Sequence, residues 1–553
     1  MGKKVILAAV MAVLGASLLV SAAFAGSAAP KASKAGGTLR VNHTTSDYQY
    51  VDPQKCYDTG CAEALWPTSL NLYQYPEKNG AEGKRVYLEA ASAVAVSKDG
   101  KTYTFTIRPN QKASNGKVVT GQWFVRAFER ALSPAMGDAA AARAGADSIV
   151  GPIVVGADAF YNGKASSISG VTAKGNKLTI KLLQPFPALA NVLAMNWFTA
   201  TDPSTPYSKD DFSGKWVTAG PYYISAHDIG RSLVLDRNPN YKGKRPANAD
   251  RIVVTVGGDE NQSVLQVKSG QVDLDPLPPA AAAASLGDEF GVNKKQFWVK
   301  PTVVTTWWAL NTQPGTPFAD VKLRKAVNWA IDRPAQVRVS GKYGGRRTDQ
   351  ILPPSMPGFI LRNDLYAYKG ANVAKAKAIA GDVSNVPTIR ILTRNSASNV
   401  NLGQLMRYEL EQIGLKAKTE AVPTAQLFDR AGNPKSNGYD IARLGWQADY
   451  PDPQNFINVL FDGKAIPTGD AGSNNWSFFN SAKYNALMGK AALMTGDPRY
   501  RTYGQMDIQM MQEAAPVAPV LNSTNRILVS SRVSNYTYND ANTYTAWNAL
   551  VIK

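Results

Sequence analysis

The chain has 553 residues, a formal net charge of +19 at pH 7, and only two cysteines and two histidines. That length is more than one hydrophobic core usually supports, so we expect two or three domains. The positive charge forms no dense lysine and arginine block and no ladder interleaved with aromatic residues, which argues against a nucleic-acid partner. A diffusely basic, solvated surface explains the charge better than an acidic ligand or an anionic surface does.

The first 25 residues have the three regions of a secretory signal peptide. Lys3 and Lys4 precede an uncharged apolar run at 5–20, and Ala23, Phe24 and Ala25 give a small-x-small cleavage pattern. An uncleaved membrane anchor is the alternative. No cysteine stands at the cleavage point, so no lipoprotein anchor is indicated, and no later run approaches the roughly 20 apolar residues of a membrane span. We therefore predict an exported, extracytoplasmic protein whose residues 26–35 form a flexible lead-in.

Cys56 and Cys61 are spaced as C-x₄-C. In an exported chain such a pair most often closes a small disulfide ring, which stabilises by about 2 kcal/mol in the chain-entropy account. A metal site is the alternative, but His43 and His227 are the only histidines and leave it without nearby ligands. We predict the disulfide and no metal.

Apolar periodicity predicts the main elements in chain order. Alternating residues around an Asp99-Gly100 turn predict a hairpin at 94–107, and Phe124, Phe128 and Leu132 form one stripe of a helix that begins after Thr120. Further strands are predicted at 177–182, 233–235, 252–254, 305–311, 389–393 and 517–520, and helices at 261–270, after Asp320, and at 402–413.

The stretch 438–457 reads GYDIARLGWQADYPDPQNFI. Its apolar start predicts a buried strand, and Trp446 and Asp449 follow where that strand ends. Pro451 and Pro453 stiffen the following turn because each fixes its own φ. A stiff turn after a buried strand suits a charge held in a cleft. The alternative is an ordinary turn or N-cap aspartate beside a core tryptophan.

Seven motifs in the same order resemble those of the peptide-binding members of the solute-binding proteins that serve ABC transporters. That order extends over nearly the whole mature chain. The matching segments are GGTLRV at 36–41, the hairpin at 94–107, AGPYY at 219–223, RNPNY at 237–241, PFADVKLRKA at 317–326, AIDR at 330–333 and RLGWQADY at 443–450.

The resemblance implies an α/β, two-lobed, three-domain periplasmic binding protein (type II-like, cluster C) with mixed sheets and flanking helices. Lobe I is then expected to be discontinuous, at 36–75, 186–305 and 525–553. A smaller domain at 76–185 would extend it, and 306–524 would form lobe II and carry the ligand-anchoring segment.

The resemblance also implies the site residues. Asp449 takes the place of the aspartate that pairs with a peptide's α-ammonium group, with Trp446 and Tyr450 beside it. Arg443 matches an arginine near the peptide's C-terminal end, and Arg394 is a candidate for the carboxylate-binding arginine of dipeptide binders. Gln447 stands where relatives have a cysteine.

The implied function is capture of peptides, without catalysis or a cofactor, by a monomer that delivers them to an ABC transporter permease. Nickel complexes, oligosaccharides and opines are alternative ligands within the same fold, and a sensor partner is an alternative role. A secreted hydrolase is the rival from another class. The chain has no G-x-S-x-G, H-E-x-x-H or P-loop motif, and its two histidines lie far apart.

Overall fold

The computed structural model describes residues 36–44, 48, 50–137, 140–211, 214–436, 438–468 and 472–553. These residues belong to one unit, Ala35–Lys553. The predicted signal peptide and the lead-in at 26–35 lie outside the described residues. Within them, no helix is both long enough and apolar enough to cross a membrane.

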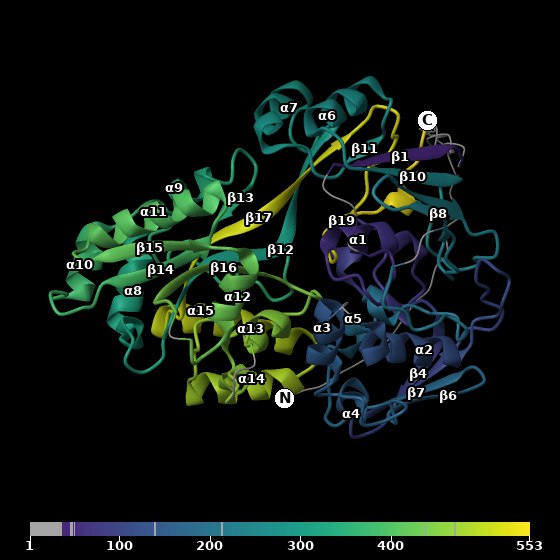
Figure 1. The fold of residues 1–553 in the computed structure, drawn as a ribbon, viewed down its shortest axis with the longest axis horizontal. Helices are drawn as coiled ribbons and strands as arrows, with labels where there is room; N and C mark the ends of the chain where they lie inside the picture. The colour runs from purple at the N-terminus through teal and green to yellow at the C-terminus, as the bar shows by residue number, and fades with distance from the viewer. Residues whose placement is uncertain are drawn as a thin grey trace, which may run out of the picture. The chain divides into compact units, whose positions relative to one another are not determined.

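The main sheet has eleven strands in the order β15-β14-β16-β12-β17-β11-β1-β10-β9-β8, with β13 paired to β17. Two long antiparallel strands, β12 (Phe297–Leu310) and β17 (Val517–Val529), connect its two halves (Figure 1). We name the half that contains β1 lobe I and the half that contains β16 lobe II.

Lobe I is built on a parallel pair of strands, β1 and β10, whose alternating residues Leu39, Val41, Ile252 and Val254 enter its core. Helix α1 contributes to the same core, while α6 and α7 pack with Phe297 and Leu528 in a second cluster. The bounds are β1 (Thr38–His43), α1 (Thr59–Leu65), β8 (Tyr222–Asp228), β9 (Ser232–Arg237), β10 (Arg251–Val256), α6 (Glu260–Ser269), β11 (Leu274–Asp275), α7 (Ala283–Phe290), β18 (Tyr538–Asn539) and β19 (Tyr544–Thr545).

A separate four-stranded sheet, β4-β5-β7-β6, contains the predicted hairpin. Helix α2 presents Phe124, Phe128 and Leu132 to the core, as the periodicity predicts. The bounds are β2 (Tyr73–Gln74), β3 (Tyr87–Leu88), β4 (Ala91–Val96), β5 (Thr102–Ile107), α2 (Gly121–Leu132), α3 (Ala140–Val150), α4 (Ala157–Tyr161), β6 (Val171–Lys174), β7 (Lys177–Lys181) and α5 (Leu189–Val192).

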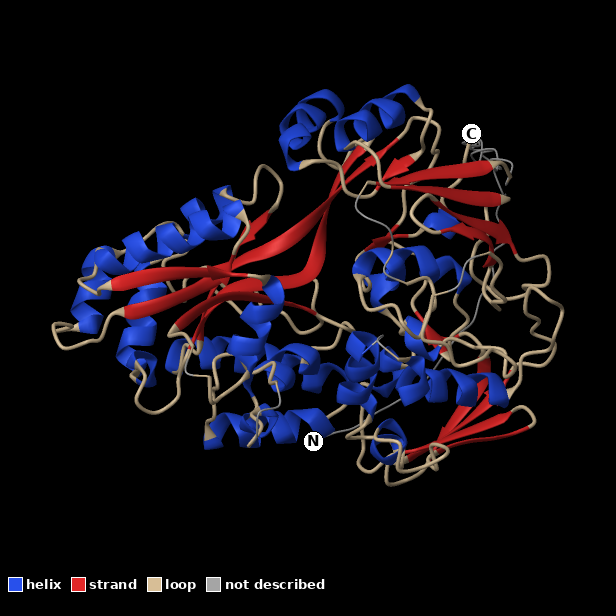
Figure 2. Cartoon of the chain, viewed as in Figure 1, coloured by secondary structure: helices blue, strands red, loops and turns tan. Residues whose placement is uncertain are grey.

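Helices cover both faces of lobe II's strands (Figure 2). Trp308 packs with α8, α10 and α11 on one face, and Trp307 packs with α12, α13, α14 and α15 on the other, because neighbouring strand residues point in opposite directions. The bounds are α8 (Val321–Ala330), α9 (Arg333–Arg338), β13 (Gly345–Arg347), α10 (Val373–Ala380), β14 (Ile389–Arg394), α11 (Ala397–Glu411), β15 (Ala417–Val422), α12 (Thr424–Gly432), β16 (Ile441–Gln447), α13 (Gln454–Phe461), α14 (Ala482–Leu493) and α15 (Gly496–Glu513).

The structure corrects two predicted boundaries. Strand β12 begins at Phe297 rather than near 305, because its first residues pair with β17 between the lobes without a regular buried pattern. Arg394 is the last residue of β14 rather than part of the following loop. The predicted cap is confirmed, since the Asp320 side chain accepts a hydrogen bond from Lys322 N at the start of α8.

Candidate functional site

The stretch 438–457 forms a strand, a turn and a helix. One edge of β16 pairs with β12 along its whole length, from Leu310 opposite Ile441 to Val304 opposite Gln447. Ala448 N donates one more hydrogen bond to Val303 O before the proline-containing turn ends the ladder. Helix α13 begins at Gln454, so Asp449 lies in the short connection between a buried strand and a buried helix.

The carboxylate of Asp449 is held by two neutral donors. Asn455 Nδ2 donates to Oδ2 at 2.9 Å, and Tyr57 Oη donates to Oδ1 at 3.2 Å. The Oδ1 atom of Asn455 accepts from Asp449 N at 2.8 Å and from Trp446 Nε1 at 3.1 Å, so one amide ties the three residues together. Burial raises the pKa of the Asp449 carboxyl above its usual range, and no cation among the described residues opposes that shift.

Arg394 and Arg443 lie close enough for their charges to interact. Burial, and after it the charge of Arg394, lowers the pKa of Arg443 to about 10. Arg443 donates to Trp307 O at 3.2 Å. The Arg394 guanidinium lies 5.4 Å from the ring centre of Phe428, and its buried Nε has no hydrogen-bond partner. In the described part of the chain neither arginine is paired with a carboxylate, so two partly desolvated positive charges lie together uncompensated.

The second edge of β16 is largely free. Strand β14 pairs with it only at Ile441 and Ala442. From Arg443 to Gln447 no described strand covers this edge, so its backbone groups are available to another extended chain. Arg443 lies at the start of the free edge and Asp449 lies just beyond its end.

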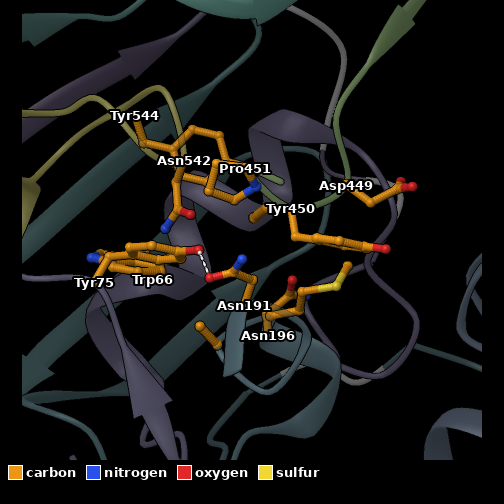
Figure 3. A pocket seen from close by; sticks show the side chains of 12 residues that line it. Trp66, Tyr75, Asn191, Asn196, Asp449, Tyr450, Pro451, Asn542 and Tyr544 are labelled. Atoms are coloured by element: carbon orange, nitrogen blue, oxygen red, sulfur yellow. Dashed lines mark hydrogen bonds between the residues drawn. The ribbon is translucent and has the colours of Figure 1, made fainter. Parts of the chain in front are cut away.

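Two cavities lie near this segment, and Tyr544 lines both. One of about 50 Å³ is lined by Trp66, Tyr75, Asn191, Asp449 and Tyr450, among others (Figure 3). The second, of about 280 Å³, is lined by residues of both lobes: His43, Thr44, Asp58, Thr59, Gly60, Glu63, Pro276, Leu277, Thr302, Val304, Gln447, Ser523, Asn525, Thr543 and Tyr544. Its volume is near the lower end of the usual range for ligand pockets, about 300 to 1,000 Å³.

The predicted site residues thus fall into two groups. Asp449, Trp446 and Tyr450 form the first, and Arg394 and Arg443 form the second. Tyr450 is buried and belongs to the hydrophobic cluster around α2, so it packs the turn of lobe II against that cluster as well as lining a cavity.

Sequence reasoning missed two residues that touch Asp449. Asn455 follows Asp449 by six positions, in the first turn of α13, and a polar side chain there was the available signal. Tyr57 is separated from Asp449 by 392 positions and lies inside the C-x₄-C spacing. Cys56 and Cys61 are joined in a disulfide, so Tyr57 is part of that covalent ring.

Two lobes joined by a pair of long strands, with a cavity that both lobes line, define a two-lobed solute-binding protein. The sequence profile of the family described as bacterial extracellular solute-binding proteins, family 5 (middle), matches residues 85–467, and the chain belongs to that family. This family consists of substrate-binding proteins rather than enzymes.

Individual relatives agree with this assignment. The chain is 26% identical over 506 residues to the probable D,D-dipeptide-binding periplasmic protein DdpA of Escherichia coli K12, covering 89% of this chain and 90% of that protein. It is 25% identical over 535 residues to the periplasmic oligopeptide-binding protein OppA of the same organism, covering 93% and 92%. Among solved structures, the fold matches clavulanic acid biosynthesis oligopeptide binding protein 2 with a TM-score of 0.82 at 20% identity, covering 94% and 96%.

Proposed function

We propose that this protein captures short peptides between its lobes and delivers them, as a monomer, to the permease subunits of an ABC transporter. The observation that carries the proposal is the placement of opposite uncompensated charges at the two ends of a free strand edge. Asp449 lies beyond one end, and Arg394 and Arg443 lie at the other. A zwitterionic peptide offers an ammonium group to the first and a carboxylate to the second. Relatives named for dipeptide and oligopeptide binding support the same ligand class.

The free edge of β16 accounts for recognition that does not depend on sequence. A peptide added as a strand would exchange main-chain hydrogen bonds with the backbone between Arg443 and Gln447. The side chains of the peptide would take no part in these hydrogen bonds and could therefore vary. At roughly 3.3 Å per residue, the backbone from Arg443 to Asp449 extends about 20 Å, which fits an extended ligand of about three to five residues once the anchoring side chains are included.

The proposed organisation follows the lobes. Lobe I comprises about 36–75, 186–305 and 525–553, the smaller domain about 76–185, and lobe II about 306–524, with the lobes closing on the ligand by a hinge movement. A signal peptide at 1–25 exports the chain. No chemical step is part of this function, so the bound peptide leaves unchanged.

Native mass spectrometry of the freshly purified protein tests the ligand class. We expect additional masses that match peptides of three to five residues. Calorimetry with alanine peptides of two to seven residues should then show affinity that changes sharply with length. It should change only modestly when side chains differ at fixed length. A co-purified nickel complex, oligosaccharide or opine, or peptides cleaved during incubation, would contradict the proposal.

A further inference from the structure

The Cys56–Cys61 disulfide closes a ring that contains Tyr57, Asp58, Thr59 and Gly60. The last three of these residues line the cavity of about 280 Å³, and Tyr57 reaches Asp449 on the other lobe. Every residue between the two cysteines therefore either lines this cavity between the lobes or contacts Asp449. A disulfide that served only to stabilise lobe I would not need to enclose this set of residues.

The ring is held on both sides. Asp58 caps α1, its Oδ1 accepting from Cys61 N at 2.8 Å. On the other side Trp197 Nε1 donates to Cys56 O at 2.7 Å, and the Trp197 ring lies 5.2 Å from the ring of Tyr57. A Cβ at Gly145 would approach Tyr57 Cζ to 3.0 Å, so this glycine leaves room for the tyrosine ring. Tyr57 is thus seated by packing while 42% of it remains exposed.

We propose that Tyr57 is a positioning residue of the ligand site, and that the Cys56–Cys61 ring holds it against Asp449, so that ligand affinity depends on the disulfide. This inference rests on the proposed role of Asp449 as the ammonium anchor. Tyr57 supplies a neutral donor to Oδ1 while Asn455 occupies Oδ2, which fixes the carboxylate without neutralising it. An ionised carboxylate accepts about four hydrogen bonds, so acceptor positions remain for an ammonium group.

Desolvation of the hydroxyl and, after it, the neighbouring Asp449 raise the pKa of Tyr57 above its usual range, so the hydroxyl stays a donor at every physiological pH. Because Tyr57 belongs to lobe I and Asp449 to lobe II, their hydrogen bond also links the lobes at the ligand anchor. The ring joins the residues before α1 to its first turn, so opening the disulfide would free Cys56 and Tyr57 from α1 and with them the placement of the hydroxyl.

A cycle of variants separates positioning from mere stabilisation. The variants are Tyr57→Phe, the pair Cys56→Ser/Cys61→Ser, and all three changes together, and calorimetry measures Kd for trialanine. We expect about a tenfold loss of affinity for Tyr57→Phe, the usual scale for one hydrogen bond to a charged group. The cysteine pair should lose a similar factor. The triple variant should lose about tenfold rather than a hundredfold, because both changes remove the same contact.

Tyr408→Phe is the matched control, since it removes a hydroxyl from an exposed tyrosine on α11. It should bind as the wild type does. If the disulfide only stabilises the fold, the cysteine variant should have a lower melting temperature. Tyr57→Phe should then still weaken binding tenfold when it is added to the cysteine variant. If the cysteine variant does not fold, wild type and Tyr57→Phe treated with reductant provide the same comparison.

The outcomes distinguish this inference from the proposal on which it rests. The role of the ring would be overturned if the triple variant lost about a hundredfold in affinity, or if Tyr57→Phe bound as tightly as the wild type. In either case Asp449→Asn would still weaken binding. If Asp449→Asn also binds as tightly as the wild type, the ammonium anchor itself is wrong.

Discussion

At the scale of single residues, the site differs from the rest of the interior in how its charges are compensated. Elsewhere the fold pairs buried arginines with carboxylates, as in Arg245 with Glu77 and Arg499 with Asp452, or surrounds them with carbonyls, as at Arg333. Arg394 has neither kind of partner among the described residues. Desolvated charges without partners destabilise a fold, so their retention at one place is typical of a binding site.

Arg394→Gln tests the carboxylate end of the site. We expect affinity for peptides with a free C-terminal carboxylate to fall about ten- to a hundredfold, the range for a lost charged hydrogen bond. C-terminally amidated peptides should bind the variant and the wild type alike, because they bring no anion to the arginine pair. Titration calorimetry with both peptide forms measures this.

Arg407→Gln is the control for that substitution. Arg407 is exposed on α11, and its ion pair with Glu411 spans 3.8 Å. Equal losses for free and amidated peptides in Arg394→Gln would show that the arginine shapes lobe II rather than binding a carboxylate.

At this scale, the sequence singled out only part of the candidate site. Asp449, Trp446 and Arg443 belong to one short motif, so a resemblance could single them out. Tyr57 could not be found this way, because its contact with Asp449 depends on how lobe I meets lobe II across 392 positions. Asn455 looked like an ordinary helix residue until the turn between β16 and α13 placed its amide on the carboxylate.

At the scale of elements, the free edge of β16 depends on a tight fit along its other edge. Gly445 lies opposite Thr306 of β12, and an added Cβ would come within 2.4 Å of Thr306 Cγ2 and 3.0 Å of Thr305 O. The two strands can pair at this point because residue 445 has no side chain.

Gly445→Ala should therefore destabilise the protein by roughly 1–3 kcal/mol, the usual scale for overpacking, and weaken peptide binding. Gly489→Ala is its matched control, because nothing lies within 4 Å of a Cβ added there in α14. It should be neutral or stabilise by up to about 1 kcal/mol, since alanine favours helix more than glycine does. Urea unfolding measures both, and an equal effect of the two substitutions would contradict the close approach.

Regular apolar periods made several elements predictable. The apolar stripe of α2 and the alternating apolar residues of β5 and β10 predicted which face of each element lies in the core. The first part of β12 carries no such period, because its residues cross between the lobes and are only partly buried. Sequence patterns therefore predicted the cores of both lobes better than the strands that join them.

At the scale of the whole molecule, several buried carboxyl groups make stability depend on pH. Burial raises the pKa of Glu63, Glu89 and Asp507 to about 7 and that of Glu409 to about 8. In the unfolded chain these groups ionise near pH 4, so between about pH 5 and 8 the folded state holds more protons. The free energy of unfolding should then fall as pH rises through this range, by at most about 1.4 kcal/mol per pH unit for each group.

Chemical unfolding at pH 5, 6, 7 and 8 measures this slope. Glu409→Gln removes one of the four carboxyl groups that titrate in this range. The free energy of unfolding of this variant should therefore fall less steeply with pH than that of the wild type. Stability that rises from pH 5 to pH 8 in the wild type would contradict the pKa shifts. Glu411→Gln, on the same helix but exposed, should leave the slope unchanged.

The ordered motifs were sufficient to predict the fold class and the family, because they extend from residue 36 to residue 450. The proposed limits of the lobes depend instead on β12 and β17, which belong to both lobes at once. Because these two strands pair within both lobes, the order of strands in the sheet describes the lobes better than a set of sequence ranges does.

The most direct test of the central claim, that Asp449 holds a peptide's ammonium group, combines Asp449→Asn with acetylation of the peptide's N-terminus. Leaving a desolvated charge unpaired typically costs about 3–5 kcal/mol. Asp449→Asn should therefore weaken binding of a free-amine peptide by about a hundredfold to a thousandfold or more. Acetylation should weaken wild-type binding comparably. The two changes together should lose less than the product of the separate factors, because neither partner is then left as an unpaired charge. If Asp449→Asn, folded as judged by its melting temperature, binds free-amine peptides as tightly as the wild type, Asp449 is a turn residue beside a core tryptophan and not the ligand anchor.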